Sequence, residues 1–537
     1  MTENTTNETF RDFLERLRQE HELTDIKQAV NIRHIATLVD QSDKALLFHN
    51  VIGYKIPVVS GIFRNQRRTA LSMGCSRFPE IETRLRQAID HPIPPVYRDG
   101  GRDVTVRGDD VDLFRLPIPI CSVDDGGPMI TAGVVMARDP EYGVNAGVYR
   151  FLVKERNLTG IDIVTPNNLR LFAQRALDAG RTCPISISIG VHPFDIMGAG
   201  YRAPLGVDEM GLAGGLRGAP ATLASCETID VPCVADAEFV LEAEILPTGW
   251  VWPEGRFGEF TRLMGGLHWN PLVRIKAITH RRNPIYYSLH MPWENTWLGA
   301  PTRYAAIRAA LKTAGVQVKD INVTTGGCAM WHAVISIRKQ AGEGKNALLA
   351  ALSVMDVKHV VVVDDDIDVF NAVDVEWAIA SRVQGDRDVF VIPGARAKPL
   401  DPSLPIVPYG TVPTGAKVGI DATIGEGIPR ERFERISYAC ADSVRLDDYL
   451  SGKADESPAV VNAPPDEVSQ LARKIHALIE KAPRYYSEIA EQFSEYDFQS
   501  VTRALGKLHA DEKLWQDPRG RMCIRGSAFA AKPPVRS

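Results

Sequence analysis

The sequence predicts a multidomain protein that combines α/β regions with a β-rich centre. The start of the chain reads as helix and strand, the middle as short strands separated by Gly and Pro, and the part after residue 312 as alternating strands and helices. With 537 residues, 45% hydrophobic and 24% charged, the chain is long enough for two to four domains that each bury a core. The predicted domains are an N-terminal α/β region (1–115), a β-rich domain (116–312), a second α/β domain (313–455) and a small tail (465–537).

The elements of the first two regions follow from hydrophobic periodicity. Residues 8–18 place four apolar side chains on one face of a helix, and residues 44–51 and 54–63 read as two strands joined by a turn. The central strands are predicted at 130–139, 145–155, 184–191, 237–246 and 272–280. Their short lengths and Gly/Pro breaks favour a sandwich or barrel that carries its function on loops.

The C-terminal half returns to sheet and helix. Strands are predicted at 318–325, 331–339, 358–368 and 388–394, with helices at 344–355 and 373–383. A linker rich in Ser, Ala and Pro covers 451–467. The tail is predicted to contain helices at 466–481, 486–493 and 497–512, followed by a β-hairpin that turns at Pro518–Gly520. Three helices and a hairpin are typical of a small winged-helix domain.

Charge and cysteine usage exclude several classes of protein. The net charge of −5 is small for this length, and the tail from Asp466 onward has 12 Lys and Arg against 10 Asp and Glu, so nucleic acid is not an expected partner. The tail is expected to make an oligomer contact or to cover an active site. Eight cysteines without a C-x-x-C pair argue against a zinc ribbon or a disulfide framework. A polar N-terminus and the lack of a long apolar run predict a cytoplasmic protein with no membrane partner.

The segment Pro253–Phe260, with the sequence PEGRFGEF, is the first candidate for chemistry. In a regular strand Glu254 and Glu259 would point to opposite faces, because side chains alternate. Gly255 and Gly258 permit an irregular loop in which the two carboxylates meet. Beside an arginine, one carboxylate is then held ionised while the other exchanges a proton, as general acid–base catalysis requires. The alternative is a surface turn with two solvated acids.

Three further fragments carry residue types that suit a metal ion or a cofactor. Arg150 follows an Asn-Ala-Gly stretch in GVNAGVYRFLV, at the end of a predicted strand, and an asparagine oxygen there suits a hard cation. Glu209 precedes a glycine-rich turn in GVDEMGLAGGLRGAP, where it is either a metal ligand or a loop acid. Lys417 lies in a loop of small residues, GAKVGIDAT, which suits a phosphate. None of the three is specific by itself.

Taken in this order, the fragments resemble the UbiD family of prenylated-FMN-dependent (de)carboxylases. The resemblance runs through most of residues 8–455 and includes Val363–Gly394, which is similar to the family's stretch leading into its lysine-containing loop. It implies a UbiD-like fold with an N-terminal α/β region, a central split β-barrel that binds the flavin, and a C-terminal α/β domain that makes oligomer contacts. The winged-helix-like tail is an addition to that pattern.

The resemblance also assigns roles to individual residues. The family's catalytic network falls on Arg150, Glu254 and Glu259, with Glu259 as the proton donor. The family's cofactor-binding positions fall on Val148, Tyr149, Arg150, Asn167, Asn168 and Lys417.

The family's metal positions fall on Asn145, Asn168 and Glu209. The chain departs from the family here, because TPNNLR has Asn168 where a histidine is usual. An asparagine still offers an oxygen to a divalent cation. The implied cofactors are prenylated FMN, a divalent metal (Mn²⁺ first, with Mg²⁺ or Fe²⁺ as alternatives) and K⁺. The implied partners are a small aromatic acid, CO₂, a flavin prenyltransferase that supplies the cofactor, and further copies of the chain in a dimer or hexamer.

The implied activity is the reversible, non-oxidative decarboxylation of an aromatic or heteroaromatic carboxylic acid. After Glu259 the sequence differs from the one that is usual in the family and places Arg262 and His268 near the expected pocket. They either recognise a second acidic or polar group of the substrate or are a surface arginine and a histidine at the edge of the core. An aromatic acyl-CoA of the phthaloyl-CoA type is an alternative substrate. A catalytically silent assembly or DNA-associated protein is the alternative of a different class, and the intact Arg150, Glu254 and Glu259 argue against it.

Overall fold

The computed structural model describes residues 8–98, 102–164, 166–201, 203–407, 411–452 and 463–532. The chain divides into two compact units, Met1–Ile428 and Pro429–Ser537. The part of the predicted linker at 453–462 lies outside the described residues. The domain boundaries expected within the first unit stay predictions. All eight cysteines are free thiols, as expected.

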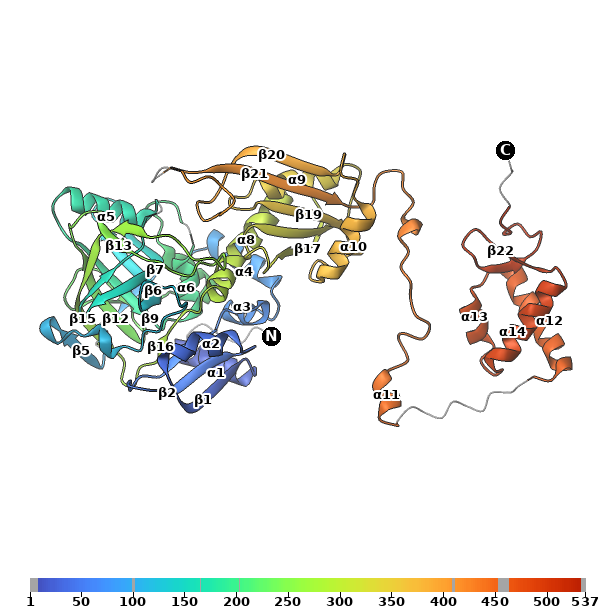
Figure 1. Ribbon diagram of the computed structural model, residues 1–537, viewed down its shortest axis with the longest axis horizontal. Coiled ribbons are helices and arrows are strands. Elements are labelled where there is room, and N and C mark those ends of the chain that lie inside the picture. The colour runs from blue at the N-terminus through green and yellow to red at the C-terminus, as the bar shows by residue number, and fades with distance from the viewer. Residues whose placement is uncertain are drawn as a thin grey trace. The chain divides into compact units, whose positions relative to one another are not determined.

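The centre of the first unit is an antiparallel sheet that closes on itself (Figure 1). The strand order is β12-β9-β6-β7-β8-β15-β5, and β12 also pairs with β15, which completes a barrel. The strands are β5 (Val104–Arg107), β6 (Met129–Asp139), β7 (Gly143–Glu155), β8 (Leu158–Gly160), β9 (Cys183–Ile189), β12 (Phe239–Ile245) and β15 (Leu272–His280). The predicted β-barrel is therefore confirmed.

Strand β6 shows why this barrel is buried on both faces. Val135 and Ala137 join the core that alternate residues of β9 and β12 also line, whereas Val134 and Met136 join a second core shared with helices outside the barrel. Successive strand residues point to opposite faces, so a strand that separates two cores must be apolar throughout. The run MITAGVVMA meets that requirement.

A four-stranded sheet, with the order β1-β2-β3-β16, forms the N-terminal region. The first helix begins where Thr9 accepts a hydrogen bond from the Asp12 backbone N–H and Asp12 reciprocates, forming a capping box. The elements are α1 (Phe10–Gln19), β1 (Leu23–Val30), η1 (Ile32–His34), α2 (Ile35–Asp40), β2 (Ala45–Val51), β3 (Val58–Ser60), α3 (Gln66–Ser72), α4 (Glu80–Asp90) and β16 (Tyr286–Tyr287).

Smaller elements surround the barrel. They are β4 (Val96–Arg98), η2 (Gly108–Asp110), η3 (Leu113–Arg115), α5 (Asn168–Asp178), α6 (Pro193–Ala199), α7 (Glu209–Arg217), β10 (Thr222–Ser225), β11 (Pro232–Val234), β13 (Trp252–Glu254) and β14 (His268–Asn270). Helix α7 corrects the prediction that Glu209 precedes a glycine-rich turn, because those glycines are helical. A Cβ at Gly214 would lie 2.3 Å from the Ile93 carbonyl oxygen, so the small residues serve close packing against the segment after α4.

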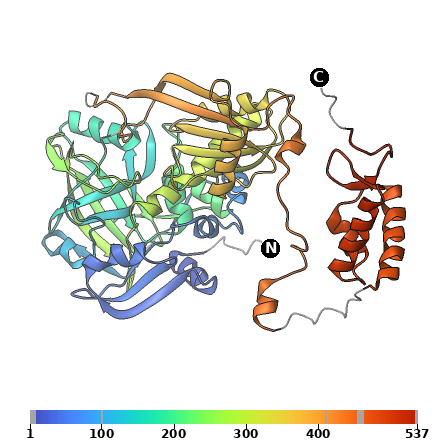
Figure 2. The ribbon, with the colours of Figure 1, turned by 45° about the vertical axis from the view of Figure 1, so that its right-hand side comes forward.

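The C-terminal part of the first unit is a mixed sheet with helices on opposite faces (Figure 2). Its order is β17-β18-β19-β21-β20. Helix α9 packs in one core and helix α10 in another. Successive residues of β19 point alternately into these two cores, so the strand lies between them. The elements are α8 (Trp293–Thr313), β17 (Val318–Val323), β18 (His332–Ile337), α9 (Glu343–Leu352), β19 (His359–Asp364), α10 (Ala372–Arg382), β20 (Val389–Arg396) and β21 (Thr414–Ala422).

Strand β21 corrects the prediction that Lys417 lies in a loop. The strand pairs with β19 on one side and β20 on the other, and Lys417 faces Ile392 in the ladder. A Cβ at Gly419 would lie 3.1 Å from Leu348, so the glycine that suggested a loop is explained by close packing of α9 on the strand.

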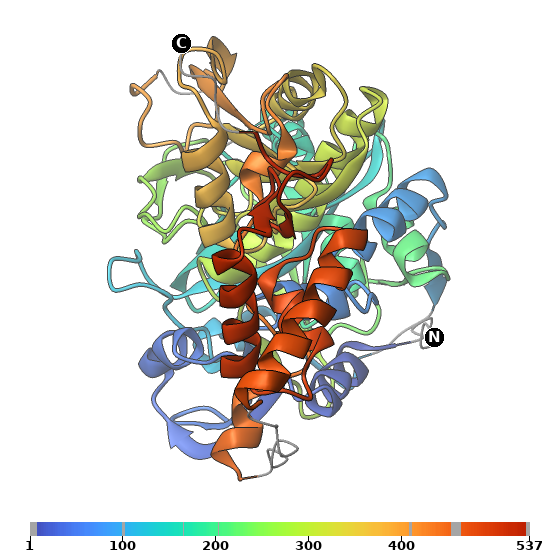
Figure 3. The same ribbon diagram turned by 90° about the vertical axis from the view of Figure 1, so that its right-hand side faces the viewer.

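The second unit contains the tail (Figure 3). Within residues 463–532 the elements are α12 (Pro465–Lys481), α13 (Tyr486–Gln492), α14 (Phe498–Ala510), β22 (Leu514–Gln516) and β23 (Met522–Ile524), and η4 (Arg430–Phe433) and α11 (Leu446–Leu450) precede them. The helices enclose a core that includes Leu471, Ile475 and Leu505. The predicted helices and hairpin are confirmed.

Candidate active site

Arg150, on barrel strand β7, lies at the centre of a cluster of carboxylates from other segments. Its Nη1 lies 2.8 Å from Glu259 Oε1, and its Nη2 lies 3.5 Å from Glu254 Oε2. Nη2 also lies 2.7 Å from Asp162 Oδ2. The structure therefore brings together the three residues predicted as a network and adds a third carboxylate. Arg150 lies within β7 and not at its end, as the sequence had suggested.

Gly255 in the loop between Glu254 and Glu259, and Gly265 beyond it, allow the two carboxylates to meet at Arg150. Gly258, the other glycine expected to matter, does not require glycine, because the nearest contact of a Cβ there would be an ordinary 3.6 Å. Gly255 has a φ of +107°, a backbone conformation that side chains disfavour, and a Cβ there would lie 2.9 Å from the Gly266 carbonyl oxygen. At Gly265, a Cβ would lie 2.9 Å from Glu259 Oε1. Glycine at these two positions leaves room for the loop and for the Glu259 side chain.

Asp125 fixes this loop to the segment before β6. Its Oδ1 accepts a hydrogen bond from the Gly258 backbone N–H at 3.0 Å. Its Oδ2 accepts from the backbone N–H groups of Cys121 and Ser122 at 2.9 and 2.8 Å. One carboxylate thus ties the residue before Glu259 to a second chain segment, a role that the sequence analysis did not find.

Burial and charge set the protonation of this cluster. Burial raises the pKa of Glu254, while the neighbouring Arg150 acts in the opposite direction. Glu254 Oε1 is buried and has no hydrogen-bond partner among the described residues. An unpartnered carboxylate oxygen in a buried site favours the neutral acid. Burial opposes the charge of Arg150, yet the carboxylates of Asp162, Glu254 and Glu259 raise its pKa, so the guanidinium stays charged.

His268 joins the cluster through Asp162. Its Nδ1 lies 3.2 Å from Asp162 Oδ1, and His268 stands opposite Glu254 in the β13–β14 ladder. His268 was expected near the pocket from the sequence, whereas Asp162 was not. The position of Asp162 between the apolar residues Ile161 and Ile163 could have indicated its role. A carboxylate in a segment that is otherwise apolar is expected to have a charged or hydrogen-bonding partner when that segment is buried.

Arg262, the other residue expected near the pocket, points elsewhere. Its Nη2 donates to the Gly326 carbonyl oxygen at 3.4 Å, and its guanidinium lies 5.8 Å from the centre of the Trp293 ring. The structure therefore separates Arg262 from the Arg150 cluster and places it against the C-terminal part of the unit.

Ligand atoms of Asp162, Glu254 and His268 lie within 4.8 Å of one another, a spacing that a metal ion could bridge. The guanidinium of Arg150 already contacts both carboxylates. A second cation there would face a fixed positive charge at short range. We therefore describe this group as a protein ion-pair cluster.

A second buried cluster on β7 is formed by Asn145 and Glu209. Asn145 Nδ2 donates to Glu209 Oε1 at 2.6 Å, and the Ala146 backbone N–H donates to Oε2 at 2.8 Å. Glu209 opens helix α7 and is almost fully buried. Burial raises its pKa to about 7, and the hydrogen bonds from Ala146 and Asn145 only partly offset that effect. All of these partners are neutral.

The remaining predicted cofactor positions are divided between two places. Val148 and Tyr149 precede Arg150 on β7, and the Tyr149 hydroxyl donates to Asn167 Oδ1 at 3.2 Å. Asn167 caps helix α5 by accepting from the Arg170 backbone N–H, and Asn168 is the first residue of that helix. Among the contacts of the described residues, none joins the Asn168 side chain to Asn145 or Glu209.

Lys417 lies apart from these residues. Its Nζ donates to the carbonyl oxygens of Leu352 and Val354 at 2.6 and 3.1 Å, which holds the ammonium group at the C-terminal end of α9. The structure does not bring Lys417 into contact with the other predicted site residues, so its phosphate-binding role stays a prediction.

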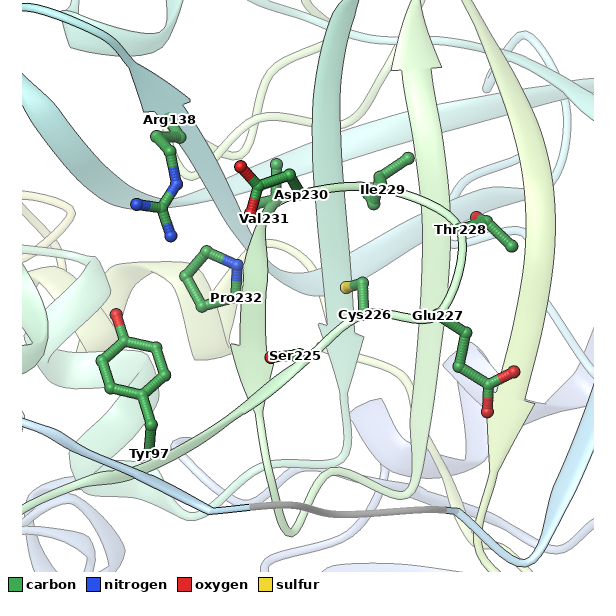
Figure 4. Close-up of a pocket in the computed structure, with 10 residues that line it drawn as sticks. All are labelled: Tyr97, Arg138, Ser225, Cys226, Glu227, Thr228, Ile229, Asp230, Val231 and Pro232. Carbon is green, nitrogen blue, oxygen red and sulfur yellow. The ribbon is translucent and has the colours of Figure 1, made fainter.

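A pocket of about 380 Å³ lies beside the loop that joins β10 and β11 (Figure 4). The loop from Ser225 to Pro232 forms one wall, and Tyr97 and Arg138 complete the lining. No predicted site residue lines this pocket. Its Arg138 pairs in the β6–β7 ladder with Val144, the residue before Asn145.

The closed barrel and its buried arginine–carboxylate cluster define an enzyme site suited to anionic groups and proton transfer. Comparison with known proteins gives the family. The chain matches the N-terminal domain of 3-octaprenyl-4-hydroxybenzoate carboxy-lyase at residues 14–85, its Rift-related domain at 98–292 and its C-terminal domain at 296–422. The chain belongs to the UbiD family of carboxy-lyases. The matched regions end before the tail.

Individual relatives agree with this assignment. Anhydromevalonate phosphate decarboxylase of Methanothermobacter thermautotrophicus is 35% identical over 80% of this chain and 99% of its own length. The UbiD-class enzyme HmfF from Pelotomaculum thermopropionicum, solved with FMN, is 38% identical with a TM-score of 0.76, over 82% of this chain and 100% of that one. An evolved dimeric form of HmfF was solved with prFMN (36% identity, TM-score 0.74, same coverage).

A more distant solved relative is 3,4-dihydroxybenzoic acid decarboxylase from Enterobacter cloacae. It is 26% identical with a TM-score of 0.73, and the match covers 82% of this chain and 98% of that one. Among the described residues, no helix is long and apolar enough to cross a membrane.

Proposed function

We propose that this protein reversibly decarboxylates an aromatic or heteroaromatic carboxylic acid with prenylated FMN, and that Arg150, Glu254 and Glu259 form its catalytic network. The contact of one buried arginine with both glutamates carries this proposal. Loss of CO₂ from an unsaturated carbon leaves an electron pair that must be delocalised and then protonated. Side chains cannot provide the electron sink, but they can provide the proton.

In this proposal each member of the network has a separate task. Glu259 is the proton donor to the carbon that loses CO₂, because it lies at the tip of the loop and in direct contact with Arg150. Arg150 orients the substrate carboxylate by charge-assisted hydrogen bonds. Glu254, buried and with a raised pKa, holds a proton next to Arg150.

Prenylated FMN, when bound, supplies the electron sink that the reaction needs. We assign its contacts to β7 and the start of α5. Val148, Tyr149 and Arg150 would lie along the flavin, while Asn167 and Asn168 offer amide groups at a helix N-terminus, which attracts phosphate. Lys417 would complete the phosphate site only if its ammonium group left the carbonyl oxygens that it now contacts.

Asn145 and Glu209 fit a divalent metal ion, with Asn168 as a further oxygen ligand. The Glu209 carboxylate is buried among neutral donors, and a cation would supply the positive charge that the protein does not. An oxygen-only ligand set favours Mn²⁺ or Mg²⁺ over softer metals, with Fe²⁺ as the alternative. K⁺ held by backbone carbonyls, a cytoplasmic location, a flavin prenyltransferase as cofactor supplier and a dimeric or hexameric assembly belong to the same proposal.

A second candidate substrate follows from the relatives. The anhydromevalonate phosphate decarboxylases of three archaea, Methanothermobacter thermautotrophicus among them, are 34–38% identical to this chain, which favours a phosphorylated acid. The 3,4-dihydroxybenzoic acid decarboxylase is only 26% identical, although it favours an aromatic acid. We keep the aromatic acid as the leading substrate and the phosphorylated acid as the second.

A substrate panel separates these candidates. The protein is produced together with a flavin prenyltransferase, and CO₂ release is measured with aromatic and heteroaromatic acids, aromatic CoA thioesters and anhydromevalonate phosphate. Turnover of an aromatic acid supports the leading proposal, and turnover of the phosphorylated acid alone replaces it with the second. Cofactor-loaded protein that releases no CO₂ from any of them contradicts both.

A further inference from the structure

Asp162 is the closest carboxylate partner of Arg150 Nη2. The separation is 2.7 Å, against 3.5 Å from the same nitrogen to Glu254 Oε2. The contact with Asp162 is a close ion pair, whereas the longer contact with Glu254 is a hydrogen bond that Nη2 donates. Asp162 and Glu259 therefore hold the two ends of the guanidinium, at 2.7 and 2.8 Å.

His268 connects this ion pair to the solvent. Its side chain is 26% exposed, whereas Asp162 is 17% exposed, Arg150 13% and Glu254 1%. Its Nδ1 contacts Asp162, and one of its ring nitrogens lies within 4.8 Å of a Glu254 oxygen, a distance that one water molecule can bridge. The exposure rises in steps from the buried acid to the histidine.

The proposed reaction needs such a connection. Replacing a carboxylate by hydrogen breaks one C–C bond, forms one C–H bond and consumes one proton for each CO₂ released. The network must therefore take up a proton from solvent in every turnover and release one in the reverse direction. Glu254 is too deeply buried to exchange with bulk water directly.

We propose that Asp162 and His268 form a positioning pair for the network: Asp162 holds Arg150 toward Glu259, and His268 exchanges the network's proton with solvent through Glu254. This inference rests on the proposed function of Arg150, Glu254 and Glu259. Neither residue touches the reacting carbon in this scheme, so both act through the network.

The charged groups around His268 favour this role. Asp162, from the segment after β8, raises the pKa of His268 by accepting its hydrogen bond, and burial works against this. Arg150 on β7 lowers the pKa of His268, and Glu254 on β13 raises it. The hydrogen bond from His268 also lowers the pKa of Asp162 against the effect of its burial. The pair is thus an ionised aspartate beside a histidine that titrates.

His268→Gln tests the exchange step, because glutamine can still bond to Asp162 but cannot titrate near neutral pH. In the cofactor-loaded enzyme, with the substrate found by the panel, we expect kcat to fall on the order of ten-fold, KM to stay unchanged and added imidazole to restore part of the rate. The pH profile of kcat for His268→Gln should lack the limb that titration of His268 gives in the wild type. The matched control is His280→Gln on β15, whose ring hydrogen-bonds to the Arg281 carbonyl oxygen and packs against Phe239, and it should change none of these.

A second measurement does not depend on activity. The pKa of His268, followed by NMR of histidine-labelled full-length protein, should fall in Asp162→Asn relative to wild type, because the ionised partner is lost. An unchanged His268 pKa overturns the pairing, and a His268→Gln enzyme with wild-type kcat at every pH overturns the exchange step. If no substrate is turned over while the NMR shift occurs, the pairing stands and the proposed function fails.

Discussion

Strand β7 contributes Arg150 to one carboxylate cluster and Asn145 to another, and the two clusters differ in what opposes the carboxylate charge. In the first, Arg150 lies between Asp162, Glu254 and Glu259, so the protein itself supplies the positive charge. In the second, Glu209 is surrounded by the neutral donors of Asn145 and Ala146, and its pKa is raised to about 7. The first cluster contains its own cation, although one guanidinium faces three carboxylates. The second has only neutral hydrogen-bond partners.

This difference separates what the fold provides from what a ligand must provide. A buried carboxylate without a cation either takes up a proton or binds a metal ion. The Arg150 cluster is therefore expected to keep its geometry without cofactor, because Arg150 already contacts all three carboxylates. The Asn145–Glu209 cluster is expected to depend on metal. Changes made in one cluster should affect chemistry, and changes in the other should affect cofactor and metal retention.

The largest effect is expected from Glu259→Gln in the first cluster. Glutamine preserves the shape and a contact with Arg150 but cannot give up a proton, so kcat should fall by about 10²–10⁴-fold. Bound flavin, measured from its absorbance, should stay at the wild-type level. Glu244→Gln on β12, which removes a carboxylate paired with Lys276, is the control and should leave kcat unchanged. Decarboxylation within a few-fold of wild type would rule out Glu259 as the proton donor.

Glu209→Gln, in the second cluster, is expected to lower metal and flavin retention, which Glu259→Gln should leave unchanged. Loss of the charged ligand should weaken divalent metal binding by at least about ten-fold, and the flavin should be lost with the metal. Metal content is measured after dialysis by elemental analysis. Asp208→Asn is the control, since asparagine still caps α7 and only a neighbouring charge is removed. Equal metal content in Glu209→Gln and wild type would break the comparison between the clusters.

Local periodicity predicted most of the elements but not those rich in small residues. The helix at Phe10–Gln19 and the strand at Met129–Asp139 were found because their apolar side chains repeat with the period of one element. Helix α7 and strand β21 were read as a turn and a loop because of their glycines. In both, glycine permits close approach to a neighbouring element, as at Gly419 against Leu348, and such neighbours cannot be seen from local sequence.

The same limit applies to the candidate site. The meeting of Glu254, Glu259 and Arg150 was expected from the glycine-containing loop and from the resemblance to the family, and the structure places these side chains in contact. Asp162 was missed although it follows Arg150 by only twelve residues, because the return of the chain beside β7 after β8 cannot be seen from local sequence. Asp125 was missed for a similar reason, since it acts through backbone N–H groups.

Asp125→Asn, which affects the loop that carries Glu259, is expected to lower kcat by less than Glu259→Gln does. Asparagine lacks the second acceptor oxygen for the N–H groups that Asp125 holds, and loss of hydrogen bonds to a charged group costs about 1.5–3 kcal/mol. We expect a lower melting temperature and a kcat reduced about ten-fold, since Glu259 is no longer held in place. Metal content should not change. The adjacent, exposed Asp124→Asn is the control, and equal effects in the two variants would contradict the role of Asp125.

Asn168→His has the smallest expected effect and tests how far the second cluster extends. An imidazole at the start of α5 would replace an amide oxygen by a nitrogen ligand, which favours Fe²⁺ and Mn²⁺ over Mg²⁺. We expect metal retention to rise by a few-fold with a shift in that direction, measured by competition between the ions in dialysed protein. Asn167→His is the comparison variant, because it removes the helix cap and should destabilise α5 by about 1 kcal/mol without changing metal preference. An unchanged metal preference in Asn168→His would show that Asn168 is not a ligand and would confine the second cluster to Asn145 and Glu209.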